Sequence, residues 1–404
     1  MAKKEDIVVG LDIGSSKTCA LICRMAGGSR LEVAGVGVSE SKGWRRGNIV
    51  NLDAAVASIR QAVEEAETEA RATVESAYVG IAGTHIRGVN AQGGLALGPH
   101  SREITREDVD RVVQRAQGVS LPPDQQIVHV FPQEYLLDAQ NGIRDPVGMV
   151  GRNLEVNVHL VTASAAALQN VVTAANRAGI YILGTVLEQM ASSESNLQDD
   201  DRELGVALVD IGASTAEIIL YEEGLLRHTA AIPVGGDHFT NDIAVGLRTP
   251  IPEAERLKCT WGLPVSGRPS FEALEVSGVG ERPSRMVPYV TLAEILEPRA
   301  TELLEMIQAE IARQGIEGQL GSGVVLTGGG AKLKGLIEMA EKILSLPVRR
   351  GIPGGLGRMG EALLDPIFSA VVGLVGYAHR MRRKQVVRQE TLGEKFLGLF
   401  RARA

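Results

Sequence analysis

Two short stretches, GLDIGSSKT (residues 10–18) and LVDIGASTA (residues 208–216), repeat one pattern. In each, an apolar run ends in an Asp, and a Gly with small hydroxyl residues turns the chain into a second apolar run. Asp210 lies 198 residues after Asp12. Both regions continue into a third apolar run, which predicts strand, turn, strand, turn, strand in each. The sequence therefore predicts an internal duplication of a strand-rich unit.

The two turns are candidates for a phosphate site. A hairpin of this kind directs several backbone N–H groups into a small space, and small side chains let phosphate oxygens approach. Asp12 and Asp210, each at the end of its strand, could hold a hydrated Mg²⁺ between the two turns. Taken singly, either turn reads more simply as a plain hairpin with an Asx-turn. Two such turns in register within a duplicated unit favour the phosphate site.

A third stretch, VVLTGGGAKLKGLIEMAEKIL (residues 324–344), predicts an apolar strand, a glycine turn and a helix with Leu333, Leu336, Ile337 and Ala340 on one face. The bare glycines Gly328, Gly329 and Gly330 leave room for a nucleoside to lie on backbone. A tight strand-to-helix turn explains the same residues equally well. GLGRMG (residues 355–360) matches G-x-G-x-x-G, but no acidic residue follows at the spacing of a ribose contact, so a loop is expected.

Around these stretches, the sequence predicts further elements. The first unit is expected to form strands at 7–13, 17–25 and 31–38, a helix at 51–71 and a buried strand at 77–83. An α+β insertion is expected at 84–160, with a helix in 101–119 capped by Ser101 or Thr105. Helices at 250–262 and 288–314, separated by a Gly/Pro/Ser-rich stretch, indicate a second inserted subdomain.

Charge is unevenly distributed along the chain. The net charge is −7, yet residues 379–404 carry eight Lys/Arg and two acids, which leaves −13 for residues 1–378. Nucleic acid is a poor partner for an acidic body without a basic aromatic platform, whereas an anionic membrane surface suits the basic tail. No signal peptide or run of about 18 apolar residues occurs, and three cysteines show no zinc spacing, so a cytosolic protein is expected.

The tail ends in LGEKFLGLFRARA (residues 392–404), where Leu392, Phe396, Leu399 and Phe400 share one helical face. We expect this helix to lie on a membrane surface, with a basic segment before it. The alternative is a helix that docks on the body of the chain. The residues expected to contact the membrane are Leu392, Lys395, Phe396, Leu397, Leu399, Phe400 and Arg401.

Together these stretches resemble the actin-like ATPase superfamily, in which two RNase-H-like halves clamp ATP. The resemblance implies ATP and Mg²⁺ as ligands and adds Gly236, in GGDHFTNDI, and the acid-x-x-Lys pair Glu255 and Lys258. It also implies that Glu188 orients the attacking water, although a lone Glu on a helix is more often solvated. The implied ATP-site residues are Asp12, Gly14, Ser15, Ser16, Lys17, Asp210, Gly212, Ala213, Ser214, Thr215, Gly236, Glu255, Lys258, Gly328, Gly329 and Gly330.

Within the superfamily, the insertion AYVGIAGTHIRGVNAQG through NLEVNVHLVTAS is most similar to the FtsA family of bacterial cell-division proteins. The resemblance runs from about residue 6 to 380 and resumes in the tail, but 262–284 aligns poorly. It implies an α/β actin-like fold with five parts. These are subdomain 1A (1–83 and 161–197), subdomain 1C (84–160), subdomain 2A (198–241 and 320–385), subdomain 2B (242–319), and a linker with an amphipathic helix (386–404).

The same resemblance implies a function at the division site, on the cytoplasmic face of the cell membrane. It implies tethering of FtsZ filaments through 2B, actin-like self-assembly, recruitment of later divisome proteins, and at most slow ATP hydrolysis. Arg299 is the candidate contact for the acidic FtsZ tail, as a cation on an exposed helix. The alternatives are a PilM-like pilus-assembly adaptor and a chaperone or sugar-kinase ATPase of the same fold.

Overall fold

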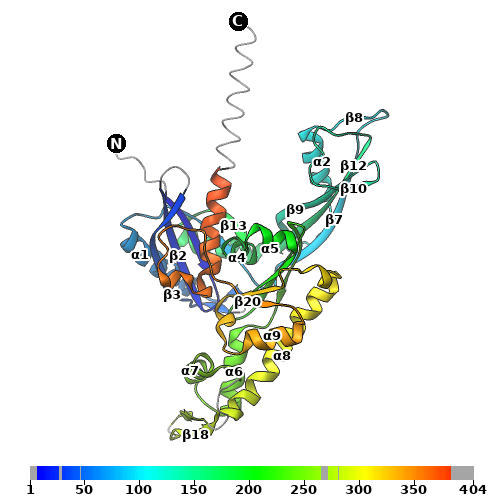
Figure 1. Cartoon of the computed structure of the whole chain (residues 1–404). Coiled ribbons are helices and arrows are strands. Elements are labelled where there is room, and N and C mark those ends of the chain that lie inside the picture. Colours follow the sequence, from blue (N-terminus) through cyan, green and yellow to red (C-terminus); the bar gives the residue numbers. More distant parts are fainter. Residues whose placement is uncertain (1–6, 27–29, 46, 265–271, 281, 384–404) are drawn as a thin grey trace.

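In the computed structural model, the described residues are 7–26, 30–45, 47–264, 272–280 and 282–383. They form two five-stranded sheets with a cleft between them, an inserted sheet that projects to one side, and a helical region at the opposite end (Figure 1). The amphipathic helix expected at residues 392–404 lies outside the described residues.

The first sheet has the order β13-β6-β1-β2-β3. Strands β1, β2 and β3 are antiparallel, whereas β6 runs parallel to β1 and β13 runs parallel to β6. Side chains alternate along β1: Val9 and Leu11 face the cluster that contains α1 and α3, and Val8 faces the helix at residues 369–383. The elements are β1 (Ile7–Ile13), β2 (Lys17–Ala26), β3 (Arg30–Glu40), β4 (Trp44–Arg45), β5 (Asn48–Ile49), α1 (Leu52–Ala70), β6 (Ser76–Ile81), α3 (Ala165–Arg177) and β13 (Tyr181–Leu187).

The second sheet repeats the first, with the order β20-β19-β14-β15-β16. Again three consecutive strands are antiparallel, and two later strands add in parallel beside the first of them. The predicted duplication is therefore confirmed, with Asp12 and Asp210 at equivalent positions. The elements are α4 (Glu188–Asn196), α5 (Asp199–Leu204), β14 (Val206–Ile211), β15 (Ala216–Glu222), β16 (Leu225–Ile232), α6 (Gly236–Leu247), β19 (Val324–Thr327), α9 (Leu336–Leu344) and β20 (Val348–Arg350).

The helix predicted directly after the glycines of 328–330 begins later than expected. Gly329–Lys332 forms a 3₁₀ turn, and α9 starts only at Leu336, after Gly335 in the left-handed region (φ +79°). Leu333 therefore precedes α9, although it still packs in the same core as Leu336. Residues 355–360 are irregular, apart from a single bridge between Gly357 and Glu32, as expected for a loop.

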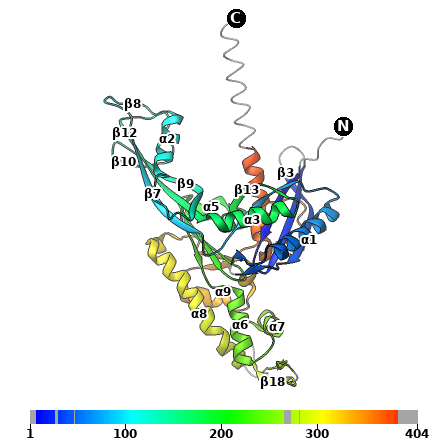
Figure 2. The same cartoon turned by 180° about the vertical axis from the view of Figure 1, so that it is seen from behind.

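The inserted α+β unit is present and projects away from the two main sheets (Figure 2). Its sheet has the order β10-β9-β12-β7, and α2 packs on it. Thr105, not Ser101, caps α2 through a reciprocal pair of hydrogen bonds with Asp108, and Val113 is only half-buried. The elements are β7 (Arg87–Ala96), β8 (Arg102–Glu103), α2 (Arg106–Ala116), β9 (Gln125–Leu137), β10 (Gln140–Ile143), β11 (Val150–Gly151) and β12 (Asn153–Ser164).

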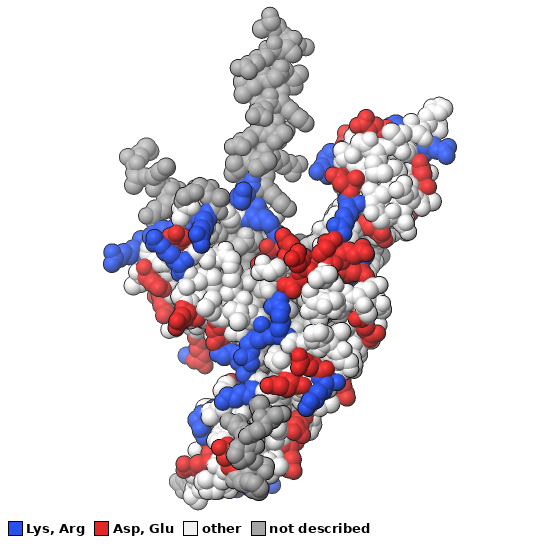
Figure 3. All heavy atoms as spheres, viewed as in Figure 1, with Lys and Arg blue, Asp and Glu red and all other residues white. Residues whose placement is uncertain are grey.

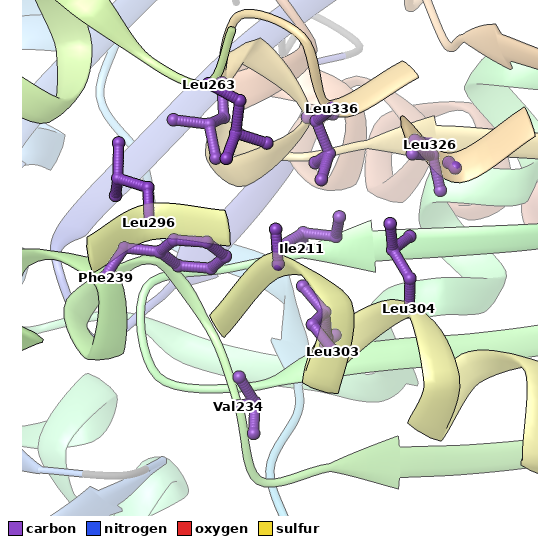
Figure 4. Packing of buried hydrophobic residues seen from close by; sticks show 14 of the residues in the cluster. Ile211, Val234, Phe239, Leu263, Leu296, Leu303, Leu304, Leu326 and Leu336 are labelled. Carbon is purple, nitrogen blue, oxygen red and sulfur yellow. The ribbon is translucent and has the colours of Figure 1, made fainter. Parts of the chain in front are cut away.

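The helical region between β16 and β19 packs against one face of the second sheet. It contains α7 (Ile251–Trp261), β17 (Ala273–Val276), β18 (Arg285–Pro288) and α8 (Tyr289–Gln314). The helix α8 continues through Pro298. Leu303 and Leu304 of α8, Phe239 of α6 and Leu336 of α9 surround Ile211, directly behind the second candidate phosphate turn (Figure 4). This core fixes the position of the turn.

The two halves meet where α4 crosses the helix at residues 369–383. A Cβ on Gly373 would lie 1.7 Å from the backbone oxygen of Ala191, so this crossing requires glycine. Leu374, one residue later, packs in a cluster with residues of both sheets, including Val186 and Leu208. The connection between the halves is therefore a tight contact between two helices.

We predict that Gly373→Ala destabilises the chain by about 1–3 kcal/mol, because the backbone of α4 must move to admit a methyl group. Gly376→Ala on the same helix is the matched control, since nothing lies within 4 Å of its added Cβ. In a helix that change should stabilise by about 0.5–1 kcal/mol. Urea unfolding of both variants measures the difference. Equal effects of the two changes would contradict the close crossing.

Candidate nucleotide cleft

The two Asp-Ile-Gly turns have the same geometry. The Gly14 N–H donates to the Lys17 carbonyl at 3.0 Å, and the Gly212 N–H donates to the Thr215 carbonyl at 2.9 Å. Each turn joins two antiparallel strands, and each strand end carries its Asp at the cleft. The turns are thus the two equivalent ends of a duplicated structure.

The second turn is held by the start of α6. The Gly236 N–H donates to the Gly212 carbonyl at 2.9 Å, and the Asp237 N–H donates to the Ala213 carbonyl at 2.7 Å. A Cβ at Gly235 would lie 2.7 Å from the carbonyl oxygens of Gly212 and Ala213. The Gly-Gly pair therefore lets a helix begin directly against the turn.

The glycines after β19 have a structural reason that the sequence did not reveal. At Gly328 (φ +78°) a Cβ would lie 2.2 Å from Asp210 Oδ1, and at Gly330 it would lie 2.2 Å from a methyl group of Ile211. Both glycines therefore allow the 3₁₀ turn to pack against the strand end that carries Asp210. Gly329 is less crowded, because its nearest neighbour would be Ile367 at 3.7 Å.

One cavity of about 600 Å³ lies between the two halves. Every residue that the sequence assigned to an ATP site lines it, including both turns, Gly236, Glu255, Lys258 and the three glycines of 328–330. Glu188 lines it as well, so its side chain faces the cavity and not bulk solvent. Residues far apart in the sequence are thus brought to one enclosed space.

Acidic side chains and a lysine share the centre of this cavity. Lys17 Nζ donates to Asp12 Oδ2 at 3.1 Å and lies 5.5 Å from the ring centre of Phe368. Burial opposes the charge of Lys17, but Asp12, Cys19 and Glu188 together outweigh it and raise the lysine pKa. Burial, with smaller repulsion from Asp12, raises the pKa of Asp210 to about 6, and the Ser192 hydroxyl donates to Asp210 at 2.5 Å. Burial and the neighbouring carboxylates also raise the pKa of Glu188.

Glu217 is a cleft residue that sequence reasoning missed. It is the cross-strand partner of Asp210, it is 3% exposed, and it accepts a hydrogen bond from Thr215 Oγ1 at 2.5 Å. Burial raises its pKa to about 8, with a further contribution from Asp210. An acid within the apolar strand AEIILYE was the available signal, because a buried charge is rare without a functional reason.

The α7 side of the cavity carries a polar triad. Lys258 Nζ lies 2.6 Å from Glu255 Oε2 and donates to the Gly236 carbonyl at 3.1 Å and to Thr240 Oγ1 at 2.9 Å. The Thr240 hydroxyl in turn donates to Glu255. Burial acts to raise the pKa of Glu255, but hydrogen bonds from Lys258 and Thr240 lower it. The triad therefore ties α7 to the start of α6.

The residues on the other side of the cavity were also not identified from the sequence. Trp44, Gly47, Ala82, His85 and Leu168 line it. Within the described part of the chain, Trp44 Nε1 and His85 Nδ1 are buried without a hydrogen-bond partner. Burial lowers the pKa of His85.

Arg299 differs from the exposed cation that the sequence suggested. Its side chain is 25% exposed, Nε lies 2.7 Å from Asp242 Oδ2, and Nη1 pairs with Glu302. The premise of a free, exposed cation was therefore wrong, because an intrahelical acid and an acid on α6 were not considered.

Two negative findings concern only the described residues. No helix there is long and apolar enough to cross a membrane. No group of three or more His, Cys, Asp or Glu side chains in that part of the chain is arranged to hold a metal ion directly.

We predict that Glu217→Gln flattens the pH dependence of stability. The folded-state pKa of about 8 lies above the value of an unfolded Glu. The contribution of the neutral Glu217 to the free energy of unfolding is therefore complete below about pH 4.3 and is lost as the pH rises through 8. Between these two pKa values the loss is about 1.4 kcal/mol per pH unit. Urea unfolding between pH 5 and 9 should show wild type losing more stability than Glu217→Gln. Glu64→Gln, at an exposed position of α1, is the control. Parallel curves for wild type and Glu217→Gln would contradict the assignment.

Comparisons with known proteins match this architecture. A family model described as "Cell division protein FtsA" matches residues 207–373, and one described as "SHS2 domain inserted in FTSA" matches residues 83–162. The chain is 43% identical to Cell division protein FtsA of Pseudomonas aeruginosa over 92% of this chain and 89% of that protein. It is 37% identical to that of Escherichia coli over 93% of this chain and 91% of that protein.

Solved structures share the fold at low identity. A PilM-PilN type IV pilus biogenesis complex aligns with a TM-score of 0.68 and 17% identity, over 92% of this chain and 98% of that one. MreB5 of Spiroplasma citri bound to ADP aligns with a TM-score of 0.55 and 12% identity, over 95% of this chain and 99% of that one. These likenesses support the actin-like fold, and the much higher identity to curated relatives decides the family. The chain therefore belongs to the FtsA family of bacterial cell division proteins.

Proposed function

We propose that the chain is an ATP-binding, actin-like protein of the divisome that polymerises on the inner face of the cytoplasmic membrane. There it tethers FtsZ filaments and recruits later division proteins. The observation that carries the ATP site is the pair of equivalent turns facing one cavity, with Asp12 and Asp210 at their strand ends. The family supports the role at the division site.

The cavity fits a nucleotide with a hydrated Mg²⁺. Backbone N–H groups of the turns at 14–17 and 212–215, with the Lys17 ammonium, would bind phosphate oxygens. Asp12 and Asp210 would hold Mg²⁺ through water, and the cation would supply charge neutralisation between the turns. The adenosine would lie against Gly328–Gly330 and the α7 pair Glu255 and Lys258. The solved MreB5 structures with ADP and AMPPNP support nucleotide binding in this fold.

Glu188 is the proposed water-orienting group. It begins α4 beneath the first sheet, and a Cβ at Gly80 would lie 3.0 Å from its Oε1. Its raised pKa disfavours the ionised form in the free chain. A bound cation would lower that pKa and favour the carboxylate, which is a stronger hydrogen-bond acceptor for water than the neutral acid.

We assign the first sheet with α1 and α3 to subdomain 1A, the inserted sheet to 1C, the second sheet to 2A, and α7 through α8 to 2B. The 1C strands also touch 2A: His159 Nε2 lies 2.9 Å from Thr229 Oγ1, and Gln133 donates to the Leu226 carbonyl at 3.0 Å. Self-assembly would use contacts of 1A, 2A, 2B and 1C, favoured by bound ATP.

We predict that Asp210→Ala and Asp210→Asn abolish ATP binding without unfolding the chain. The change removes the carboxylate that would hold hydrated Mg²⁺ opposite Asp12. Isothermal titration calorimetry with MgATP should detect no binding at concentrations that saturate wild type. Asp200→Ala, at an exposed position of α5, is the matched control. Wild-type affinity in either Asp210 variant would remove this residue from the site.

Membrane attachment is assigned to the tail, through Leu392, Phe396, Leu397, Leu399 and Phe400. One copy of this short helix should bind weakly, and a polymer would multiply the effect through avidity. We predict that the full chain sediments with anionic liposomes, more so with ATP, and that a chain stopped at Glu390 stays in solution. Sedimentation of both forms, or of neither, would contradict a membrane role for the tail.

FtsZ is proposed to dock on 2B, with Arg299 as a contact for its acidic C-terminal tail. Because Arg299 already pairs with Asp242 and Glu302, a peptide carboxylate would have to share this guanidinium. Arg299→Glu should weaken binding of the FtsZ tail peptide, measured by fluorescence anisotropy. Arg313→Glu, on the same helix and also paired with an acid, is the control. Equal affinity of wild type and Arg299→Glu would remove Arg299 from the interface.

A further inference from the structure

The end of the first sheet opposite the cleft gathers arginines from several elements. Strand β1 starts there at Ile7 and reaches the cleft at Asp12, so its first residue marks the far end. The ends of β2 and of the helix at residues 369–383, the start of β3 and the last turn of α1 meet at the same place. We call this surface the basic face and define it by Arg24, Arg30, Arg71, Arg382 and Arg383.

Hydrogen bonds to backbone carbonyls hold the basic face together. Arg382 Nη1 donates to the Ile7 carbonyl at 2.8 Å, and Ile7 is the cross-strand neighbour of Arg24. Arg24 Nη2 donates to the Ala70 carbonyl at 2.5 Å, which closes the last turn of α1 beside Arg71. Both arginines therefore donate to backbone carbonyls, and these two bonds do not cancel their positive charge.

The remaining members project outward. Arg30, Arg71 and Arg383 are exposed, and within the described ranges no hydrogen bond or ion pair of their guanidinium groups is present. The acids nearby already have partners: Glu32, the cross-strand neighbour of Arg24, pairs with Arg358 at 2.9 Å, and Glu194 pairs with Arg380 at 2.6 Å. In the last turn of α1, Glu67 accepts a hydrogen bond from the Val74 N–H, and Glu69 accepts one from the Val36 N–H. Figure 3 shows Lys and Arg around the points where the chain enters and leaves the described residues.

The position of the tail makes this face relevant to a membrane. The last described residue, Arg383, belongs to the basic face, and the first proposed anchor, Leu392, follows nine residues later in the sequence. Nine residues reach about 30 Å if extended. Electrostatic attraction to a bilayer fades within about 8 Å at physiological ionic strength. Attachment through the tail alone therefore does not fix the distance of the acidic body from the bilayer or its tilt relative to the bilayer.

We propose that the basic face is a second lipid site, which binds the phosphate headgroups of an anionic membrane directly and turns this end of the body onto the bilayer. The proposal rests on the membrane attachment proposed above. Guanidinium groups suit phosphate because their paired N–H donors match two of its oxygens. The cleft would then open away from the membrane, and 2B, at the far side of the cleft, would be presented to the cytoplasm.

The test reverses the three exposed arginines in the full chain: Arg30→Glu, Arg71→Glu and Arg383→Glu together. Co-sedimentation is measured with phosphatidylcholine vesicles containing 30% phosphatidylglycerol and with pure phosphatidylcholine. We expect about a hundredfold weaker partitioning to the anionic vesicles, since each basic residue near such a surface contributes about 1 kcal/mol. Binding to neutral vesicles should not change. The matched control is Arg106→Glu, Arg111→Glu and Arg152→Glu on the inserted unit, which alters net charge equally at exposed positions.

Because Arg383 also belongs to the basic segment before the tail helix, Arg383→Glu alone is measured beside the triple variant. An equal loss in that single variant would assign the effect to the tail and overturn the second site. If the full wild-type chain fails to bind anionic vesicles, the membrane function itself is wrong. If it binds and the basic-face variant binds equally well, headgroup contact belongs to the tail alone and the second site is overturned. An equal loss in the control triple would assign the effect to net charge and would also overturn it. Urea unfolding should show both triple variants as stable as wild type, because all six positions are exposed.

Discussion

The burial of several carboxylates in one cleft is the constraint on which this structure depends. Asp12, Glu188, Asp210 and Glu217 converge on one cavity, and Lys17 compensates only part of their charge. Burial is the main cause of the raised pKa values of Asp210 and Glu217, and repulsion by the neighbouring acids adds to it. The proposed divalent cation with a phosphate chain would relieve the cost of burying these acids, because the cation would neutralise the carboxylates while the turns bind the phosphates. Such a ligand would therefore stabilise the contact between the halves.

The two halves beside this cleft share one hydrophobic cluster, which includes Val186 of the first sheet and Leu208 of the second. The crossing of α4 with the helix at residues 369–383 has no room for a side chain at Gly373, so the halves are closely packed there. Glu188, at the start of α4, lies at the cavity, so the cleft and the crossing share one helix. A ligand that draws the two turns together would alter the angle between the halves, and with it the relative position of the inserted unit and the α7–α8 region. In a protein that assembles, that angle determines which surfaces of neighbouring copies can contact each other.

Much of this was predictable because the duplication repeats a pattern that physical chemistry explains locally. The Asp-Ile-Gly turns, the buried strands and the α+β insertion followed from apolar periodicity and glycine placement, and the structure confirms them. Glu217 was missed because a single acid in an apolar strand shows nothing of its cross-strand neighbour. Trp44 and His85 were missed because their convergence depends on how distant elements pack. Gly328 and Gly330 were predicted to leave room for a nucleoside. Their geometry shows that packing against Asp210 and Ile211 already requires glycine at both positions. Arg299 was misread because ion pairs between helices are invisible in a linear sequence.

The most direct test of the central claim is a crystal structure of the chain with Mg²⁺ and a non-hydrolysable ATP analogue. The account predicts phosphate density between the turns at 14–17 and 212–215, a hydrated cation beside Asp12 and Asp210, and the base next to Glu255 and Lys258. A nucleotide bound at the Trp44 and His85 end, or a cleft without nucleotide at saturating concentration, would contradict it.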